Sequence, residues 1–393
     1  MKKIKVLHVG YSDNKGGAAI ALQRTHNMCQ EMGLDSRKLV AFGQDKKRGA
    51  FQTYLSTRSR VRQKLNNLIN KVVLKACDTP AGIGIIPSRL HVEINSTDVD
   101  IVHLHWLGGG FMSLNDIKKI NKPVVWTMHD MWIVSGMKHV IRLNEFYSSV
   151  GSKNEGFVEK KINKFLVRMK QDIPNIYLIC PSSWMYNLCD KSINCRKKFL
   201  IPNPIDSNKW KPVLSAKKTS AKITIGYVSV GGRNSPWYKG FLYLEKVKKA
   251  LDSKNLNVEF VVIGGKYENS SKGRSFLGNL SEDHLIAALS GMDIVVHPSL
   301  VDNLPNVVVE SMSVGTPVVA FNVGGISDIV SHKVDGYLSK CCDVDDMVKG
   351  IEWSLCNLDI LKENARKKIE NEFDSVVVSG RLLSAYQEVL LDF

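Results

Sequence analysis

The segment from Asp293 to Gly325 constrains the fold of this chain more than any other. It reads DIVVHPSLVDNLPNVVVESMSVGTPVVAFNVGG, with one apolar run ending at His297 and a second beginning at Val318. Pro305 favours the first turn of a helix, which would begin near residue 306. Two strands joined by a helix form one unit of a parallel sheet. The segment therefore predicts an α/β fold.

Polar groups gather where these two strands end. Open α/β sheets bind ligands at the carboxyl ends of their strands. Backbone N–H groups at a helix N-terminus suit phosphate, and carboxylates accept hydrogen bonds from sugar hydroxyls. Asp302 and Glu310 stand eight positions apart in this stretch. We therefore expect this edge to bind phosphate and sugar hydroxyls.

Strands and helices alternate through the rest of the chain, which predicts a doubly wound α/β class. Expected strands cover 4–9, 37–42, 100–105, 124–128, 176–180, 199–201, 223–229, 258–263, 294–296 and 318–321. Expected helices cover 18–31, 157–169, 182–189, 346–372 and 375–391, with a turn at 335–337. The 393 residues are enough for two or three domains. We predict an N-terminal domain over 1–206, a polar linker over 207–222 and a C-terminal domain over 223–374.

The net charge of +16 admits nucleic acid, an anionic membrane face or phosphorylated substrates as partners. No nucleic-acid-binding motif is present, so we expect no nucleic-acid partner. Between Lys46 and Ala76 the chain carries nine Lys or Arg and no acid, with apolar residues at helical spacing. This basic segment fits either a solvated helix face or docking on anionic lipid headgroups, and the sequence leaves both open.

Two features bear on the cellular compartment. No run approaches the roughly 20 apolar residues that cross a bilayer, and the apolar start is too short for a signal peptide. The eight cysteines form no CxxC pair. Reduced thiols of this kind indicate a cytoplasmic protein, and the basic segment adds the inner face of the membrane as an alternative.

Four further residues are candidates for a site. Gly16 and Gly17 lie between the first strand and the first helix, where glycine lets the backbone approach a bound group. His129 closes an apolar run and begins a loop, at the edge where active residues lie. Lys239 stands at the start of a helix after a glycine-containing loop, where its ammonium can meet a diphosphate. Each pattern alone also fits a structural residue.

The acid, seven residues and Glu of the opening segment, followed by SMSVGTPVVAFNVGG, resemble the donor-site signature of retaining GT-B glycosyltransferases of family 4. VHLHW followed by TMHDMW resembles a recurrent pair in this group. The resemblance is strongest over 226–338. The usual first acid is Glu, whereas this chain has Asp302. The resemblance implies two Rossmann-like domains with the active site in the cleft between them, and a final helix, about 375–393, that packs back on the N-terminal domain.

The resemblance also implies the roles of individual residues. The donor would be a nucleotide-diphosphate sugar, with Glu310 on the ribose and Asp302 on the transferred sugar. His129 would lie near the reaction centre, and the acceptor would be a saccharide, expected on a lipid carrier in cell-surface polysaccharide synthesis. Because a fixed cation would stabilise the departing diphosphate, we expect no metal and no other cofactor. The remaining donor-binding candidates are Gly16, Gly17, Arg233, Lys239, Asn303, Leu304, Asn306 and Val307.

Three alternatives to a glycosyltransferase remain open from the sequence. A nucleotide-sugar epimerase of the same fold would process the donor without an acceptor. A phosphorylase would require free phosphate. A non-catalytic nucleotide-sugar-binding protein would bind the donor without turnover.

Overall fold

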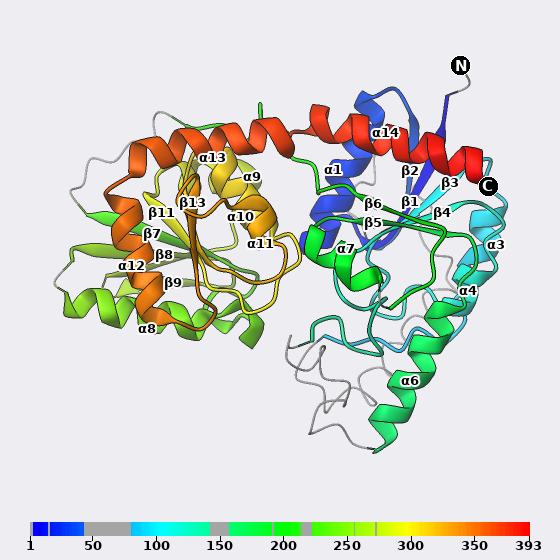
Figure 1. Cartoon of the computed structure of the whole chain (residues 1–393), viewed down its shortest axis with the longest axis horizontal. Coiled ribbons are helices and arrows are strands. Elements are labelled where there is room, and N and C mark those ends of the chain that lie inside the picture. The colour runs from blue at the N-terminus through cyan, green and yellow to red at the C-terminus, as the bar shows by residue number, and fades with distance from the viewer. Residues whose placement is uncertain are drawn as a thin grey trace. The chain divides into compact units, whose positions relative to one another are not determined.

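The computed structural model describes residues 3–14, 16–42, 80–141, 157–190, 192–213, 222–254, 256–271 and 273–393. The chain divides into two compact units (Figure 1). Unit 1 comprises Met1–Pro204 with Val378–Phe393, and unit 2 comprises Ile205–Val377. The basic segment 46–76 lies outside the described residues. None of the described helices is long and apolar enough to cross a membrane.

Unit 1 contains a six-stranded sheet in the order β2-β1-β3-β4-β5-β6. Every neighbouring pair is parallel. The chain passes from β1 to β2 on one side and then returns to β3 on the other side of β1. The strand order therefore reverses between β1 and β3, which is where open parallel sheets bind ligands. The strands are β1 (Lys5–Ser12), β2 (Asp35–Phe42), β3 (Ile101–Leu104), β4 (Val124–Thr127), β5 (Ile176–Cys180) and β6 (Lys197–Leu200).

Two helices cover one face of this sheet. Met28 of α1 and Leu382 of α14 belong to the same buried cluster as Val6 and Val125 of the strands. In Figure 1 the α14 ribbon lies next to these strands. Residues 378–393 are thus part of unit 1. Its helices are α1 (Gly17–Glu31), α3 (Leu90–Asn95), α4 (Leu114–Lys118), α6 (Phe157–Gln171), α7 (Ser183–Asp190) and most of α14 (Ser375–Asp392).

Unit 2 contains a seven-stranded sheet in the order β13-β12-β11-β7-β8-β10-β9. Its pairs are parallel except for β9 with β10. The order reverses between β7 and β11, so this pair marks the expected ligand edge of unit 2. The strands are β7 (Ile223–Val228), β8 (Val258–Ile263), β9 (Tyr267–Ser271), β10 (Arg274–Gly278), β11 (Ile294–His297), β12 (Val318–Phe321) and β13 (Gly336–Ser339).

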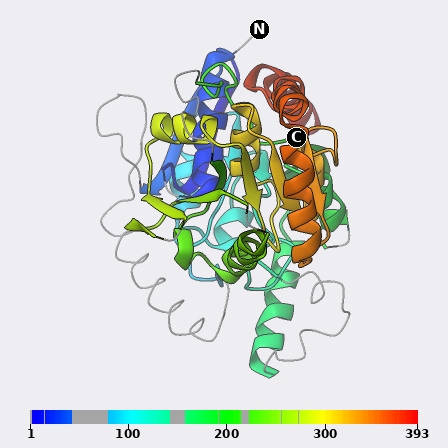
Figure 2. The same cartoon turned by 90° about the vertical axis from the view of Figure 1, so that its left-hand side faces the viewer.

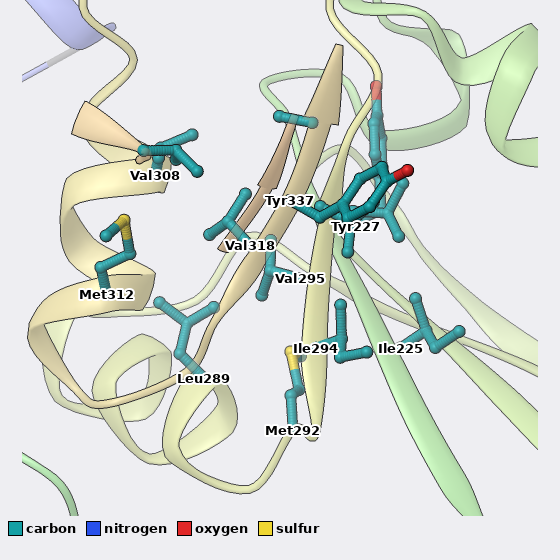
Figure 3. Close-up of a cluster of buried hydrophobic side chains, with 14 of the residues drawn as sticks. Ile225, Tyr227, Leu289, Met292, Ile294, Val295, Val308, Met312, Val318 and Tyr337 are labelled. Carbon is teal, nitrogen blue, oxygen red and sulfur yellow. The ribbon is translucent and has the colours of Figure 1, made fainter. Parts of the chain in front are cut away.

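Helices lie on both faces of the unit 2 sheet (Figures 1 and 2). In Figure 3, Val308 and Met312 of α10 and Leu289 of α9 lie beside Val295 and Val318 of the strands. All five side chains are buried in one apolar core. The longer helices are α8 (Phe241–Ser253), α9 (Glu282–Ser290), α10 (Asn306–Ser313), α12 (Val344–Leu355) and α13 (Leu358–Glu372), with short α11 (Ile326–Ile329), η2 (Gly232–Asn234) and η3 (Trp237–Lys239).

The predicted strands and long helices are present, and two local predictions were wrong. The single helix expected over 346–372 is two helices, because α12 ends at Leu355 and the side chain of Asn357 donates to the carbonyl of Trp353 at 2.7 Å. Gly336 and Tyr337 form β13 rather than a turn, because they pair with Val318 and Val319 of β12. The strand at Gly336 depends on a partner strand that the local sequence does not display.

The first half of the predicted linker packs into unit 2. Trp210 is buried in the core of that unit. The guanidinium of Arg366 donates to the carbonyls of Ser207 at 2.8 Å, Trp210 at 2.6 Å and Ser313 at 2.6 Å. These hydrogen bonds attach residues 207–210 to α10 and α13. Residues 214–221 lie outside the described residues.

Candidate active site

Lys239 and Asp302 meet at the ligand edge of unit 2. Lys239 Nζ lies 2.7 Å from Asp302 Oδ2, and His297 Nε2 lies 3.2 Å from the same oxygen. The Lys239 side chain is 31% exposed, against 13% for Asp302 and 5% for His297. Lys239 follows β7 and Asp302 follows β11, the two strands between which the strand order reverses. The sheet topology thus brings together two residues 63 positions apart.

The surroundings keep both members of this pair charged. Burial lowers the pKa of Lys239, but the nearby Asp302 carboxylate outweighs it, and the net pKa of Lys239 is raised. Burial raises the pKa of Asp302, but Lys239 and His297 outweigh it, and the net pKa of Asp302 is well below its ordinary value. At neutral pH the edge therefore carries an ammonium and a carboxylate in contact.

Two glycines let the loops around this pair approach each other closely. Gly240 has φ 72°, and a Cβ there would lie 1.8 Å from the carbonyl oxygen of Pro298. Gly324 has φ 59°, and a Cβ there would lie 1.7 Å from the carbonyl oxygen of Asp302. The backbone N–H of Gly325 donates to that same carbonyl at 3.2 Å. The loops after β7, β11 and β12 are thus held by backbone contacts that tolerate no side chain.

The other predicted donor residues of the opening segment lie on the same loop or on α10. Asn303 and Leu304 are buried before the helix, which begins at Asn306 as predicted. Val307 follows in the first turn. Glu310 is buried and lies four residues after Asn306, on the same side of the helix. The structure therefore places four of them around the start of α10 and Glu310 one turn further along that helix.

Of the remaining candidates, Arg233 belongs to unit 2, whereas Gly16 and Gly17 belong to unit 1. Arg233 is exposed on η2, in the loop after β7. Gly16 precedes α1 with φ 91°, and a Cβ there would meet nothing within 4 Å. Gly17 is the first residue of α1, and both glycines are exposed. They follow β1, one of the two strands at the order reversal of unit 1.

His129 lies just past β4 in unit 1. Its Nε2 is 3.0 Å from His105 Nδ1, and the two rings are stacked at 5.3 Å and 18°. Burial lowers the pKa of His129 to about 4, so the imidazole is neutral at neutral pH. The neighbouring Asp130 accepts hydrogen bonds from the Trp106 indole at 2.7 Å and from His139 Nδ1 at 2.6 Å. Asp130 therefore anchors the loop that carries His129.

Three functional candidates escaped the sequence analysis. His297 is the last residue of β11, and this position at the carboxyl end of a strand could have identified it, as it identified His129 after β4. His8 lies in β1 beside His103 of β3. Asp13, in the loop before Gly16, accepts a hydrogen bond from buried Lys38 at 3.0 Å. Nothing in the local sequence pairs Asp13 with Lys38, because the two meet only through the β1–β2 register.

His8, His103 and His105 could in principle hold a metal, since one ligand atom from each lies within 4.8 Å of the others. Both ring nitrogens of His103 are engaged, by Tyr386 Oη at 2.6 Å and Thr127 Oγ1 at 2.7 Å. Both ring nitrogens of His105 are engaged as well, by His8 at 3.1 Å and by His129. The cluster is therefore arranged as a hydrogen-bonded network, and a metal would have to break several of these bonds.

The sequence is similar to those of known glycosyltransferases. Residues 224–357 match the family model described as Glycosyl transferases group 1. UDP-Gal:alpha-D-GlcNAc-diphosphoundecaprenol alpha-1,3-galactosyltransferase of Escherichia coli is 26% identical over 77% of this chain and 79% of its own length. The capsular polysaccharide biosynthesis glycosyltransferase CapM of Staphylococcus aureus is 28% identical over 47% of this chain and 51% of its own length.

Two solved structures share the fold over nearly the whole chain. Sucrose-phosphate synthase of Thermosynechococcus elongatus superposes with a TM-score of 0.71 at 14% identity, covering 100% of both chains. HepE of Anabaena, solved in complex with UDP, superposes with a TM-score of 0.66 at 17% identity, covering 98% of this chain and 100% of HepE. Residues 224–357 match the group 1 family and both units share the fold of these structures, so the chain is a glycosyltransferase of the GT-B fold.

Proposed function

We propose that the protein transfers a hexose from a UDP-sugar to a saccharide carried on a polyprenyl diphosphate, with retention at the anomeric carbon. The observation that carries the proposal is the Lys239–Asp302 ion pair, placed where the strand order of unit 2 reverses. Ligands of open parallel sheets bind at such a point. The partly exposed ammonium matches a diphosphate, and the carboxylate matches the hydroxyls of a sugar.

The two oxygens of Asp302 have different tasks in this proposal. Oδ2 accepts from both Lys239 and His297, which fixes the orientation of the carboxylate. Oδ1 has no hydrogen-bond partner among the residues that the structure describes, so it can accept from a hydroxyl of the transferred sugar. Glu310, buried on α10, would accept from the ribose hydroxyls. Asp302 is one methylene shorter than the usual Glu, and its contact with Lys239 would set the position from which it binds the sugar.

The reaction would break the bond between the anomeric carbon and the diphosphate oxygen, and form a bond from that carbon to the acceptor oxygen. The proton of the acceptor hydroxyl would pass to the departing phosphate oxygen on the same face. Negative charge grows on the diphosphate as its bond breaks, and Lys239 with the first-turn N–H groups of α10 would stabilise it. Because these groups are fixed beforehand, the proposal needs no divalent metal, and activity should persist in EDTA.

The relatives support the choice of donor and acceptor. The Escherichia coli relative is named for UDP-Gal and for a diphosphoundecaprenol-linked acceptor. HepE has been solved with UDP and with UDP-glucose. These names motivate uridine as the base and a polyprenyl carrier for the acceptor. We infer a place on the cytoplasmic face of the membrane, where the basic segment 46–76 would contact anionic headgroups.

A panel experiment tests the proposed function. Purified protein is incubated with UDP-, GDP- and ADP-hexoses, and the shift of the unfolding temperature identifies the donor, since a ligand of the folded state stabilises it. Transfer is then followed with and without a polyprenyl diphosphate sugar. We expect stabilisation by UDP-sugars and turnover that requires the acceptor. Donor conversion without any acceptor would contradict the proposal.

The membrane contact needs a separate measurement. Reversing the charge of Arg58, Arg60 and Arg62 should reduce sedimentation with vesicles that contain anionic lipid, while transfer to a short soluble acceptor stays unchanged. Unchanged sedimentation with those vesicles would exclude this segment as the contact.

A further inference from the structure

Three imidazoles of unit 1 form a continuous hydrogen-bonded line that ends at the candidate active-site histidine. His8 Nδ1 lies 3.1 Å from His105 Nε2, and His105 Nδ1 lies 3.0 Å from His129 Nε2. Each bond uses one nitrogen of each ring, so the line has two free ends. One end is His8 Nε2, and the other is His129 Nδ1.

The sheet register produces this line. His8 of β1 is the register partner of His103 on β3, and side chains two residues apart share a face. His105 therefore follows His103 on the same face, one step closer to the carboxyl edge, and its ring stacks on that of His103 at 4.4 Å. His129 is reached past β4 at that edge. The line thus runs from β1 past the end of β3 to the loop that follows β4.

The two ends of the line have opposite surroundings. His8 is fully buried, and its Nε2 has no hydrogen-bond partner among the described residues. His129 is partly exposed, and its Nδ1 also has no partner within the described part of the chain. Only the His129 end is therefore placed to meet a ligand.

The three rings are neutral at neutral pH. Burial lowers the pKa of His129 to about 4 and places the pKa values of His8 and His105 well below their ordinary value. A neutral imidazole has one N–H donor and one acceptor nitrogen. Two successive hydrogen bonds between neutral rings must therefore run in the same direction along the line.

The buried end decides which direction that is. If His8 Nε2 carried the proton, a buried N–H would have no acceptor. Buried donors without a partner are rarer in proteins than acceptors with an unused lone pair. The proton of His8 therefore belongs on Nδ1, which donates to His105 Nε2. His105 Nδ1 in turn donates to His129 Nε2, and the proton of His129 must lie on Nδ1.

We propose that His8 and His105 are positioning residues that fix His129 in the Nδ1–H tautomer, so that this histidine presents a hydrogen-bond donor to the bound sugar or phosphate. The identity of that ligand rests on the proposed function, whereas the tautomer does not. In this form His129 holds an oxygen of the substrate in place. It does not remove the acceptor proton, because its one basic nitrogen already accepts from His105.

Nitrogen NMR of the full chain with 15N-labelled histidine tests the tautomer directly. At pH 7 we expect His129 to show a protonated Nδ1 and an unprotonated Nε2, the minor tautomer of a free histidine side chain. A proton on Nε2, or on both nitrogens, would overturn the proposal. This spectrum needs no substrate, so a failed donor assay and a failed tautomer assignment are separate results.

Two variants then ask whether His8 sets the tautomer. His8→Leu removes the first donor of the line, and His129 should shift toward the Nε2–H form, with KM for the donor raised about tenfold for one lost hydrogen bond and kcat changed less. His91→Leu is the control, because His91 Nδ1 bonds Asp116 Oδ1 at 2.6 Å and makes no contact with the three rings of the line among the described residues. Its His129 spectrum should be unchanged. The same His129 tautomer in both variants would show that His8 has no such role.

Discussion

Lys239 Nζ and Asp302 Oδ2 are 2.7 Å apart, so the residues expected to bind the diphosphate and the sugar form one ion pair. Each holds the other in its charged form. A nucleotide-sugar would therefore meet a site whose cation and carboxylate are already oriented. Pre-organisation of this kind lowers the cost of stabilising charge as the diphosphate leaves.

Replacing Lys239 with methionine should weaken UDP binding and lower kcat/KM roughly 10²- to 10³-fold, the usual cost of losing one group that stabilises transition-state charge. Calorimetric titration with UDP and initial rates measure the two effects. Lys249→Met is the matched control, because Lys249 is exposed on α8 and should retain full activity. Equal losses in both variants would indicate a general charge effect instead.

Asp302→Asn tests the charge of the carboxylate, and Asp302→Glu tests the length of the side chain. The amide should lower turnover and leave Lys239 without its counter-charge, whereas glutamate, the usual residue of the family signature, should keep the ion pair and most of the activity. Rates with the preferred donor and with its 4-epimer measure both effects. If asparagine supported the wild-type rate, the carboxylate would have no part in transfer.

The stability of the protein should fall in acid because of its buried histidines. The pKa values of His129 and His103 are lowered to about 4 and about 3, whereas an unfolded histidine titrates near about 6.5. The unfolded chain therefore binds more protons as the pH falls below about 6.5, and the free energy of unfolding decreases until the folded pKa values are reached. Urea denaturation between pH 7 and 4 measures this slope. His129→Gln should make it shallower, and an unchanged slope would contradict the assignment.

Lys170 should support the loop behind His129. Its buried Nζ donates to the carbonyls of Trp132, Ser135 at 2.8 Å and Gly136 at 2.6 Å. Lys170→Met would leave these carbonyls without a donor, at about 1–3 kcal/mol for a buried group that loses its partner. Thermal unfolding should show a Tm lowered by several degrees. Lys164→Met, on the exposed side of α6, should leave Tm unchanged.

Replacing Gly324, which lies against another backbone segment, should destabilise the protein, and replacing Gly380, which does not, is the control. Gly324→Ala should lower both Tm and activity, since its Cβ would lie 1.7 Å from the carbonyl oxygen of Asp302 and would move that loop. Gly380→Ala on α14 meets nothing within 4 Å, so it should stabilise by about 0.5–1 kcal/mol through helix propensity. A Gly324→Ala protein with wild-type Tm and rate would show that the loop contact is unimportant.

The sequence predicted the fold well where a pattern is local. The apolar runs at 258–263 and 318–321 are β8 and β12 with the same bounds, and α10 begins at Asn306 as Pro305 indicated. The break at Asn357 and the strand at Gly336 were missed because their causes are a capping hydrogen bond and a neighbouring strand.

The candidate site, like the fold, was predictable where the signal is local. Lys239, Asp302 and His129 could be chosen because each follows a strand, and the carboxyl ends of parallel strands lie at one edge of each sheet. Their partners could not. His297 and His8 became candidates only because the fold places Asp302 Oδ2 beside His297 and His105 Nε2 beside His8. Interactions across the sheet depend on register, which the sequence of one strand does not reveal.

Transfer from a labelled UDP-hexose to a polyprenyl diphosphate saccharide tests the central claim most directly, with wild type, Lys239→Met and Lys249→Met compared at equal concentration. The proposed function predicts an acceptor-dependent product with the anomeric configuration of the donor, formed by wild type and Lys249→Met and nearly lost in Lys239→Met. Equal product from Lys239→Met, or an inverted product, would contradict it.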